Sequence, residues 1–119
     1  MDAAELTKEG YYATLGGAGA RMEMPGCSLC MGNQAQIKEG STAISTSTRN
    51  FPNRLGKNTN VFLGSAELVA VCSKLGRIPT VEEYMGEIGV VTKDADKIYK
   101  YMNFDQIEEY AETAKTVKA

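Results

Sequence analysis

The sequence predicts an α/β fold in which helices cover a small sheet, and two observations lead to this prediction. Two short runs rich in β-branched or apolar residues, Thr42–Ser47 and Asn60–Gly64, are typical of strands. After Ser65 the chain instead carries capping residues and apolar side chains at helical spacing. Strands interleaved with helices favour a layered sheet with helices. The 119 residues contain no repeat or linker, so they form one small domain or a part of one.

Local signals predict the elements that precede the first strand. The capping box in Asp2–Glu5 predicts a short helix that ends near Glu9. The glycine-rich stretch Gly16–Ala20 predicts a turn. Alternating polar and apolar residues in Arg21–Met24 predict a strand that leads into the first two cysteines, and a short helix is expected after Cys30.

The middle of the chain predicts two strands joined by a long loop. Thr42–Ser47 is β-branched and alternating, as expected for the first strand. Residues 49–60 contain Pro52, Gly56 and four asparagines, which is typical of a loop. The apolar run Asn60–Gly64 predicts a second, buried strand.

The next segment predicts a helix with a defined start and end. Ser65 is a good N-cap, and Gly76 is a residue type that ends helices. Leu68, Cys72 and Leu75 fall on one face of that helix. We therefore interpret Cys72 as a small buried hydrophobe, with metal ligation as the alternative.

Further helices are expected towards the end of the chain. Thr80–Glu83 forms a second capping box. Residues 93–102 and 105–116 are also predicted to be helical, and Asp105 with Glu108 matches a cap for the last of them. These helices would cover the sheet.

Composition and charge exclude several classes of function. A net charge of −2 gives no basic stripe for nucleic acid. No apolar run approaches the roughly 20 residues of a membrane span, and the first residues are acidic where a signal peptide would be basic. We therefore expect a cytoplasmic protein. The absence of histidine excludes a Ser-His or Cys-His pair and a His-ligated zinc within this chain.

The two cysteines of the C-x-x-C loop, Cys27 and Cys30, are the first candidates for chemistry. A turn of two residues lets both sulfurs converge on one metal, and three cysteines in total argue against a complete disulfide framework. The pair is compatible with an iron–sulfur cluster, which needs three or four thiolates. A structural zinc site, a thioredoxin-like redox pair, and a quiet surface pair or disulfide remain open on the residues alone.

Two arginines, Arg49 and Arg54, are the second set of candidates. A guanidinium offers a planar fork that matches a carboxylate, and no acidic residue occurs in residues 42–66. This pattern favours an anion site, although two solvent-facing arginines would give the same sequence. The hydroxyls of residues 45–48 would suit substrate oxygens or a solvent-facing strand edge equally well.

The motifs around these residues resemble those of the bacterial aconitate hydratase B (aconitase B) family. Met24–Ala35 contains the C-x-x-C-x-G signature, and Ser45–Gly56 contains Arg-Asn-Phe-x-x-Arg. The likeness extends through Val61–Leu68 and Ile78–Tyr84 and covers essentially the whole chain. The two signatures are specific in combination, and each alone would be weaker.

The resemblance implies a fold and an activity. It implies that residues 1–119 are a single partial domain, the C-terminal part of an aconitase swivelling-core (α/β/α) catalytic domain. It implies a hydro-lyase of the tricarboxylic acid cycle that interconverts citrate and isocitrate through cis-aconitate. The base and the acid of that reaction belong to segments absent here, so the isolated chain is expected to be inactive.

The resemblance also implies ligands for the site residues. Cys27 and Cys30 match two of the three cysteines that hold a [4Fe–4S] cluster, whereas the third has no counterpart here and Cys72 does not match it. Arg49 and Arg54 match arginines that bind substrate carboxylates. The cysteine turn and both arginines are then expected to share one pocket.

Other partners and functions remain as alternatives. A non-catalytic RNA-binding module is one, because aconitases as a family also act in messenger-RNA regulation, and a dithiol redox module is another. A membrane partner is not expected. Apolar surface left uncovered by missing domains would favour self-association of the chain.

Overall fold

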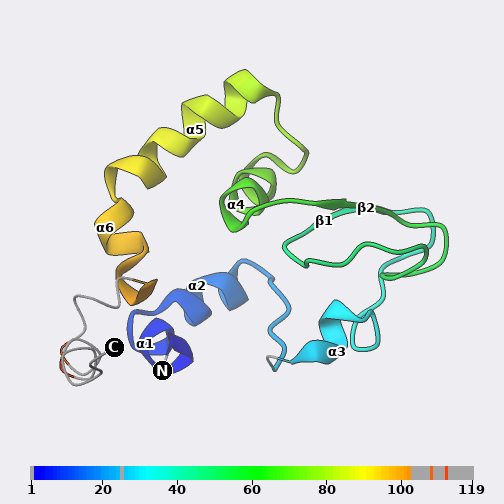
Figure 1. The fold of residues 1–119 in the computed structure, drawn as a ribbon, viewed down its shortest axis with the longest axis horizontal. Coiled ribbons are helices and arrows are strands. Elements are labelled where there is room, and N and C mark those ends of the chain that lie inside the picture. Colours follow the sequence, from blue (N-terminus) through cyan, green and yellow to red (C-terminus); the bar gives the residue numbers. More distant parts are fainter. Residues whose placement is uncertain (1, 25, 103–107, 109–111, 113–119) are drawn as a thin grey trace, which may run out of the picture. The chain divides into compact units, whose positions relative to one another are not determined.

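The computed structural model describes residues 2–24, 26–102, 108 and 112, and these divide into two compact units (Figure 1). One unit comprises Met1–Met24 with Asp94–Ala119, and the other is Pro25–Lys93. Within the described residues, no helix combines the length and the apolar character that crossing a bilayer requires.

The first unit is helical. The predicted first helix is present as α1 (Asp2–Lys8), and α2 (Tyr11–Gly17) packs against it. Gly10 joins the two in the left-handed region at φ 80°. The unit also contains α6 (Ala95–Ile98) and the 3-10 helix η1 (Lys100–Met102).

Two predictions for this unit, a turn and a strand, are wrong. The turn expected at Gly16–Ala20 begins only after α2, which the sequence did not reveal because two glycines weaken its helical propensity. Arg21–Met24 forms no strand, because the sheet of the described residues consists of β1 and β2 alone. The helical stretch expected over 93–102 is confirmed, although the structure divides it into the short helices α6 and η1. Of the helix expected over 105–116, all but residues 108 and 112 lie outside the described residues.

The second unit is built on a parallel pair of strands, β1 (Thr42–Ser45) and β2 (Asn60–Leu63). Thr42 pairs with Asn60 and Ser45 with Leu63, so both strands end at the same edge. The expected strands and the loop between them are therefore confirmed. The expected burial of the second strand is wrong, because Phe62 is 51% exposed and Leu63 is 43% exposed.

Helix α4 (Ala66–Leu75) packs against β1, as expected for a helix that covers the sheet (Figure 1). Its predicted caps are confirmed. The Ser65 hydroxyl accepts a hydrogen bond from the backbone N–H of Leu68 at 3.2 Å, and Gly76 adopts φ 70°. Cys72 is buried beside Val71, which confirms that it packs in the core.

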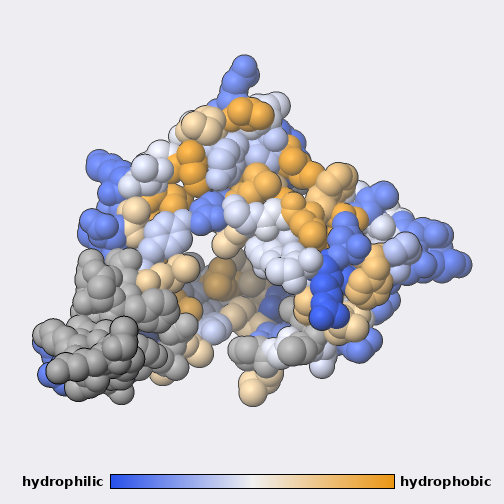
Figure 2. Space-filling view, in the orientation of Figure 1, coloured by the Kyte–Doolittle hydropathy of each residue, from blue (hydrophilic) through white to orange (hydrophobic). Residues whose placement is uncertain are grey.

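Helix α5 (Val81–Lys93) packs against α4 and leaves apolar side chains exposed. Figure 2 shows apolar surface over these two helices, where Val81, Met85 and Val90 are each more than half exposed. Exposed apolar surface often marks a contact site. Self-association of the chain stays a prediction.

The start of α5 is the capping box predicted from the sequence. The Thr80 backbone N–H donates to the Glu83 carboxylate at 2.8 Å, and the Glu83 backbone N–H donates to the Thr80 hydroxyl at 3.3 Å. Arg77 adds a two-pronged contact, with Nη1 at 2.8 Å and Nη2 at 2.5 Å from the two Glu83 oxygens. The Arg77 hydrogen bonds, followed by the Thr80 backbone bond, lower the pKa of Glu83 from 4.5 to about 2.

This lowered pKa makes the free energy of unfolding of the chain depend on pH in the acidic range. Because the folded-state pKa of Glu83 lies below its unfolded value, the contribution is complete above pH 4.5 and is lost as the pH falls towards 2. We expect Glu83→Gln to lower the melting temperature at pH 7 and to converge on the unmutated chain near pH 2. Circular dichroism melts at several pH values measure this. Glu82→Gln, which removes the same charge one residue away, is the control, and a Glu83→Gln difference that is independent of pH would contradict the prediction.

Candidate functional site

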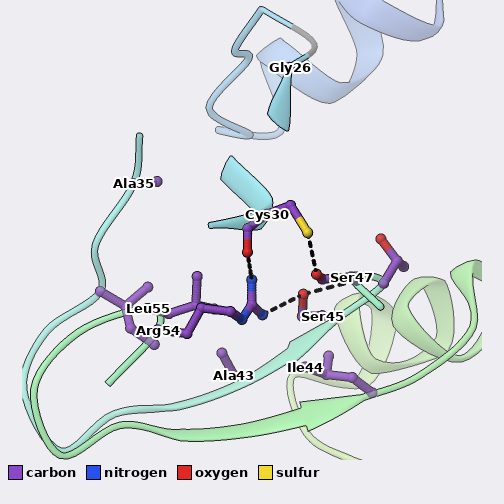
Figure 3. Close-up of a pocket in the computed structure, with 11 residues that line it drawn as sticks. Gly26, Cys30, Ala35, Ala43, Ile44, Ser45, Ser47, Arg54 and Leu55 are labelled. Carbon is purple, nitrogen blue, oxygen red and sulfur yellow. Dashed lines mark hydrogen bonds between the residues drawn. The ribbon is translucent and has the colours of Figure 1, made fainter. Parts of the chain in front are cut away.

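A cavity of about 450 Å³ lies at the end of β1 within the second unit (Figure 3). The short helix α3 (Cys27–Cys30) borders it, together with β1 and the loop that connects the strands. Apolar side chains such as Ala43 and Leu55 form part of its wall. Its polar lining is supplied by Cys30, Ser45, Thr46, Ser47 and Arg54.

Arg54 is the most deeply buried polar residue of this site, with only 3% of its surface exposed. Its Nη1 donates to the backbone carbonyl of Cys30 at 3.2 Å, and its Nη2 donates to the Ser45 hydroxyl at 3.0 Å (Figure 3). Its Nε is buried and finds no hydrogen-bond partner among the described residues. The guanidinium therefore joins the cysteine helix to β1 and retains unused donors.

The charge of Arg54 is not compensated by the described residues. None of their carboxylates lies within ion-pair distance of Arg54 or of Arg49. A buried cation that bonds only neutral groups is costly, whereas an anion in the cavity would offset that cost. The site is thus suited to an anion.

Cys30 presents its side chain to the same cavity. Its Sγ lies 3.0 Å from the Ser47 Oγ, and the thiol is free (Figure 3). The Ser47 hydroxyl in turn accepts a hydrogen bond from the backbone N–H of Arg49 at 3.2 Å. The exposed Arg49 guanidinium donates from Nη1 to the Met31 sulfur at 3.0 Å, next to the cysteine helix.

Gly32 allows the cysteine segment to approach the arginine loop. It is buried at φ 77°, and a Cβ added there would lie 1.7 Å from the Arg54 carbonyl oxygen. Its own carbonyl accepts a hydrogen bond from the Gln36 side chain at 3.0 Å. The close approach of Gly32 to Arg54 was not predicted from the sequence, although the glycine of the C-x-x-C-x-G motif was the available signal.

The structure brings together most of the residues that the sequence singled out. Cys30 and Arg54 line one cavity, and Arg49 reaches the residue after Cys30. The short helix expected after Cys30 instead spans Cys27–Cys30, and the side chain of Cys27 lies outside what the structure describes. Cys72 lines a different cavity of about 570 Å³ between β1 and the end of α4. Among the described residues, no three His, Cys, Asp or Glu side chains form a metal-binding group.

In this cavity a thiol of the C-x-x-C segment lies beside a buried arginine. Residues 3–76 match the model of the Aconitase family (aconitate hydratase). That match covers more than half of the chain, and the chain therefore belongs to the aconitase family.

Individual relatives extend the match over nearly the whole chain. Aconitate hydratase B of Pseudomonas aeruginosa is 63% identical over 118 residues, which are 99% of this chain and 14% of that protein. The proteins of the same name from Salmonella typhimurium and Escherichia coli are 60% and 59% identical over 96% of this chain. The chain spans only 13–14% of the length of these relatives.

Proposed function

We propose that this chain is a part of an aconitate hydratase that interconverts citrate and isocitrate through cis-aconitate. The observation that carries the proposal is the buried, uncompensated Arg54 beside the Cys30 thiol in one cavity. The relatives named aconitate hydratase B support it, since their identity reaches 63%. We further propose that residues 1–119 are a single partial domain, the C-terminal part of a swivelling-core α/β/α domain.

Cys27 and Cys30 would hold a [4Fe–4S] cluster together with a third thiolate from outside this chain. The donor chemistry fits, because a free Cys30 thiol opens on the cavity and a thiolate is the ligand such clusters require. Cys72 does not fit as the third ligand, because it is buried beside the other cavity. When bound, the cluster supplies a Lewis-acidic iron that polarises the substrate hydroxyl.

Arg54 and Arg49 would bind the carboxylates of the substrate. Arg54 uses two of its donor nitrogens within the protein and leaves Nε for an anion. Because its Nη groups are fixed by Cys30 and Ser45, the guanidinium is oriented before the substrate arrives, which lowers the entropic cost of binding. The charge of the guanidinium opposes the negative charge that develops as a proton leaves the substrate carbon.

The catalytic base and the catalytic acid would come from other parts of the enzyme. The Ser45 hydroxyl accepts from Arg54 and from the Ser47 backbone N–H, and the Ser47 hydroxyl is engaged with Cys30 and Arg49. Within the described lining of the cavity no carboxylate, lysine or tyrosine is present to take a proton. We therefore infer that this chain binds and orients, and that the longer protein performs the proton transfers.

A comparison of the chain with the full-length protein that contains it tests this proposal. Both are reconstituted anaerobically with iron and sulfide and assayed for interconversion of citrate and isocitrate. We expect turnover from the full-length protein and none from the 119-residue chain. A cluster-loaded full-length protein that does not act on either acid would overturn the proposed activity. Robust turnover by the chain alone would overturn the inference that the proton transfers require other parts of the enzyme.

A further inference from the structure

Ser47 is the side chain that contacts the sulfur of Cys30, and its hydroxyl has a proton to donate once that sulfur is a metal-bound thiolate, which can only accept. The Ser47 Oγ accepts from the Arg49 backbone N–H at 3.2 Å and lies 3.0 Å from the Cys30 Sγ. Since a hydroxyl carries one proton and the Arg49 contact occupies an acceptor lone pair, that proton remains available for the sulfur. Both residues line the cavity and are partly buried, so water competes weakly for this bond.

The segment that carries Ser47 is itself held in place. The Ser47 backbone N–H donates to the Ser45 hydroxyl at 3.2 Å, and the same hydroxyl accepts from Arg54 at 3.0 Å. Arg54 in turn bonds the carbonyl of Cys30 at 3.2 Å. The Ser47 hydroxyl and the Cys30 sulfur are therefore fixed with respect to each other by a closed set of hydrogen bonds.

We propose that Ser47 is a positioning residue that donates a hydrogen bond to the metal-ligating sulfur of Cys30 and thereby raises the reduction potential of the bound cluster. The proposal rests on the proposed function, because it requires Cys30 to be a ligand. A donor near a ligating thiolate stabilises negative charge on it, and the reduced cluster carries more of that charge. The hydroxyl thus favours the reduced form over the oxidised form.

The test is a mediated potentiometric titration of the cluster-loaded full-length protein, with dithionite as the reductant. We expect Ser47→Ala to shift the midpoint to a more negative value. A change of about tenfold in the one-electron equilibrium corresponds to about 59 mV. Ser47→Thr keeps the hydroxyl and is expected to restore the original potential. Thr46→Ala removes a neighbouring hydroxyl of the same cavity that makes no hydrogen bond within the described residues, and it is expected to leave the potential unchanged.

The outcomes separate this inference from the proposed function. A loaded protein in which Ser47→Ala has the same midpoint as the unmutated protein would overturn the inference and leave the proposed function intact. A full-length protein that never acquires a cluster would overturn the proposed function and the inference with it. A merely structural role of Ser47 would lower the melting temperature and leave the midpoint unmoved. If the Ser47→Ala variant does not acquire a cluster, the Ser47→Gly variant is measured instead, because it also lacks the hydroxyl. Its midpoint must show the same negative shift.

Discussion

Replacement of Gly32 by alanine is expected to unfold or severely destabilise the cysteine segment of the second unit. Two costs combine at this position. Alanine at φ 77° loses roughly 1–2 kcal/mol through its left-handed backbone. In addition, its Cβ would meet the Arg54 carbonyl oxygen at 1.7 Å, and a backbone atom cannot move aside as a flexible side chain would. We therefore expect a loss of more than about 2 kcal/mol in the free energy of unfolding.

Gly40→Ala is the matched control for this prediction. Gly40 has a similar φ of 74°, but apart from its two chain neighbours no described residue has an atom within 4 Å of the position of its Cβ. The Gly40→Ala variant therefore measures the free-energy cost of the left-handed backbone without a steric clash of the added Cβ. Urea unfolding of the two variants, followed by circular dichroism, compares them. Equal losses of stability in Gly32→Ala and Gly40→Ala would show that the approach of Gly32 to Arg54 is not required.

Replacement of Arg54 by lysine is expected to damage the site although it keeps the positive charge. A lysine has one nitrogen in place of the fork, so it cannot reach both the Cys30 carbonyl and the Ser45 hydroxyl as Arg54 does. In the full-length protein we expect kcat/KM for citrate to fall roughly 10²-fold or more, the magnitude typical of removing one preorganised donor. Steady-state kinetics of the cluster-loaded variant measure this.

The stability of the 119-residue chain gives a second readout for Arg54→Lys. The substitution leaves a buried carbonyl or hydroxyl without its donor, and we expect a loss of about 1–3 kcal/mol. Arg49→Lys is the control for this stability measurement, because the Arg49 side chain is exposed and, among the described residues, bonds only the Met31 sulfur. In the kinetic measurement, a kcat/KM of Arg54→Lys within twofold of that of the unmutated protein would contradict a role of Arg54 in binding the substrate.

The sequence was most informative where structure depends on neighbours along the chain. The caps at Ser65 and Thr80 were predicted because a serine or threonine hydroxyl bonds an N–H only three residues away. Gly76 was predicted as a helix end for a similar reason, since its φ of 70° suits a residue without Cβ. Both strands were predicted from their composition. In the caps and the helix end, the interacting residues lie within a few positions of each other in the sequence.

The sequence was least informative where the outcome depends on distant packing. Helix α2 contains two glycines and depends on its contact with α1, which no local pattern encodes. Arg21–Met24 alternates as a strand does, but a strand needs a neighbour, and none of the described residues pairs with it. Burial of Phe62 was predicted from its hydrophobicity alone, whereas burial requires a covering layer.

The candidate site falls between these two cases. The residue types and spacings of its two motifs predicted a thiol beside a cationic pocket. The pattern did not reveal that Arg54 would bond the Cys30 backbone, that Gly32 would lie against Arg54, or that Ser47 would contact the sulfur. These contacts join residues 17 to 24 positions apart, and they depend on how the loop folds back over the cysteine helix.

The bond between Arg54 and the Cys30 carbonyl has a thermodynamic consequence for the proposed enzyme. One guanidinium contacts both the backbone of a proposed cluster ligand and the space for the anion. If occupancy of either place shifts this arginine, the affinities for metal and tricarboxylate become coupled, and reciprocity requires each to alter the other by the same factor. Retention of iron and recognition of the acid would then be two expressions of a single cooperative equilibrium.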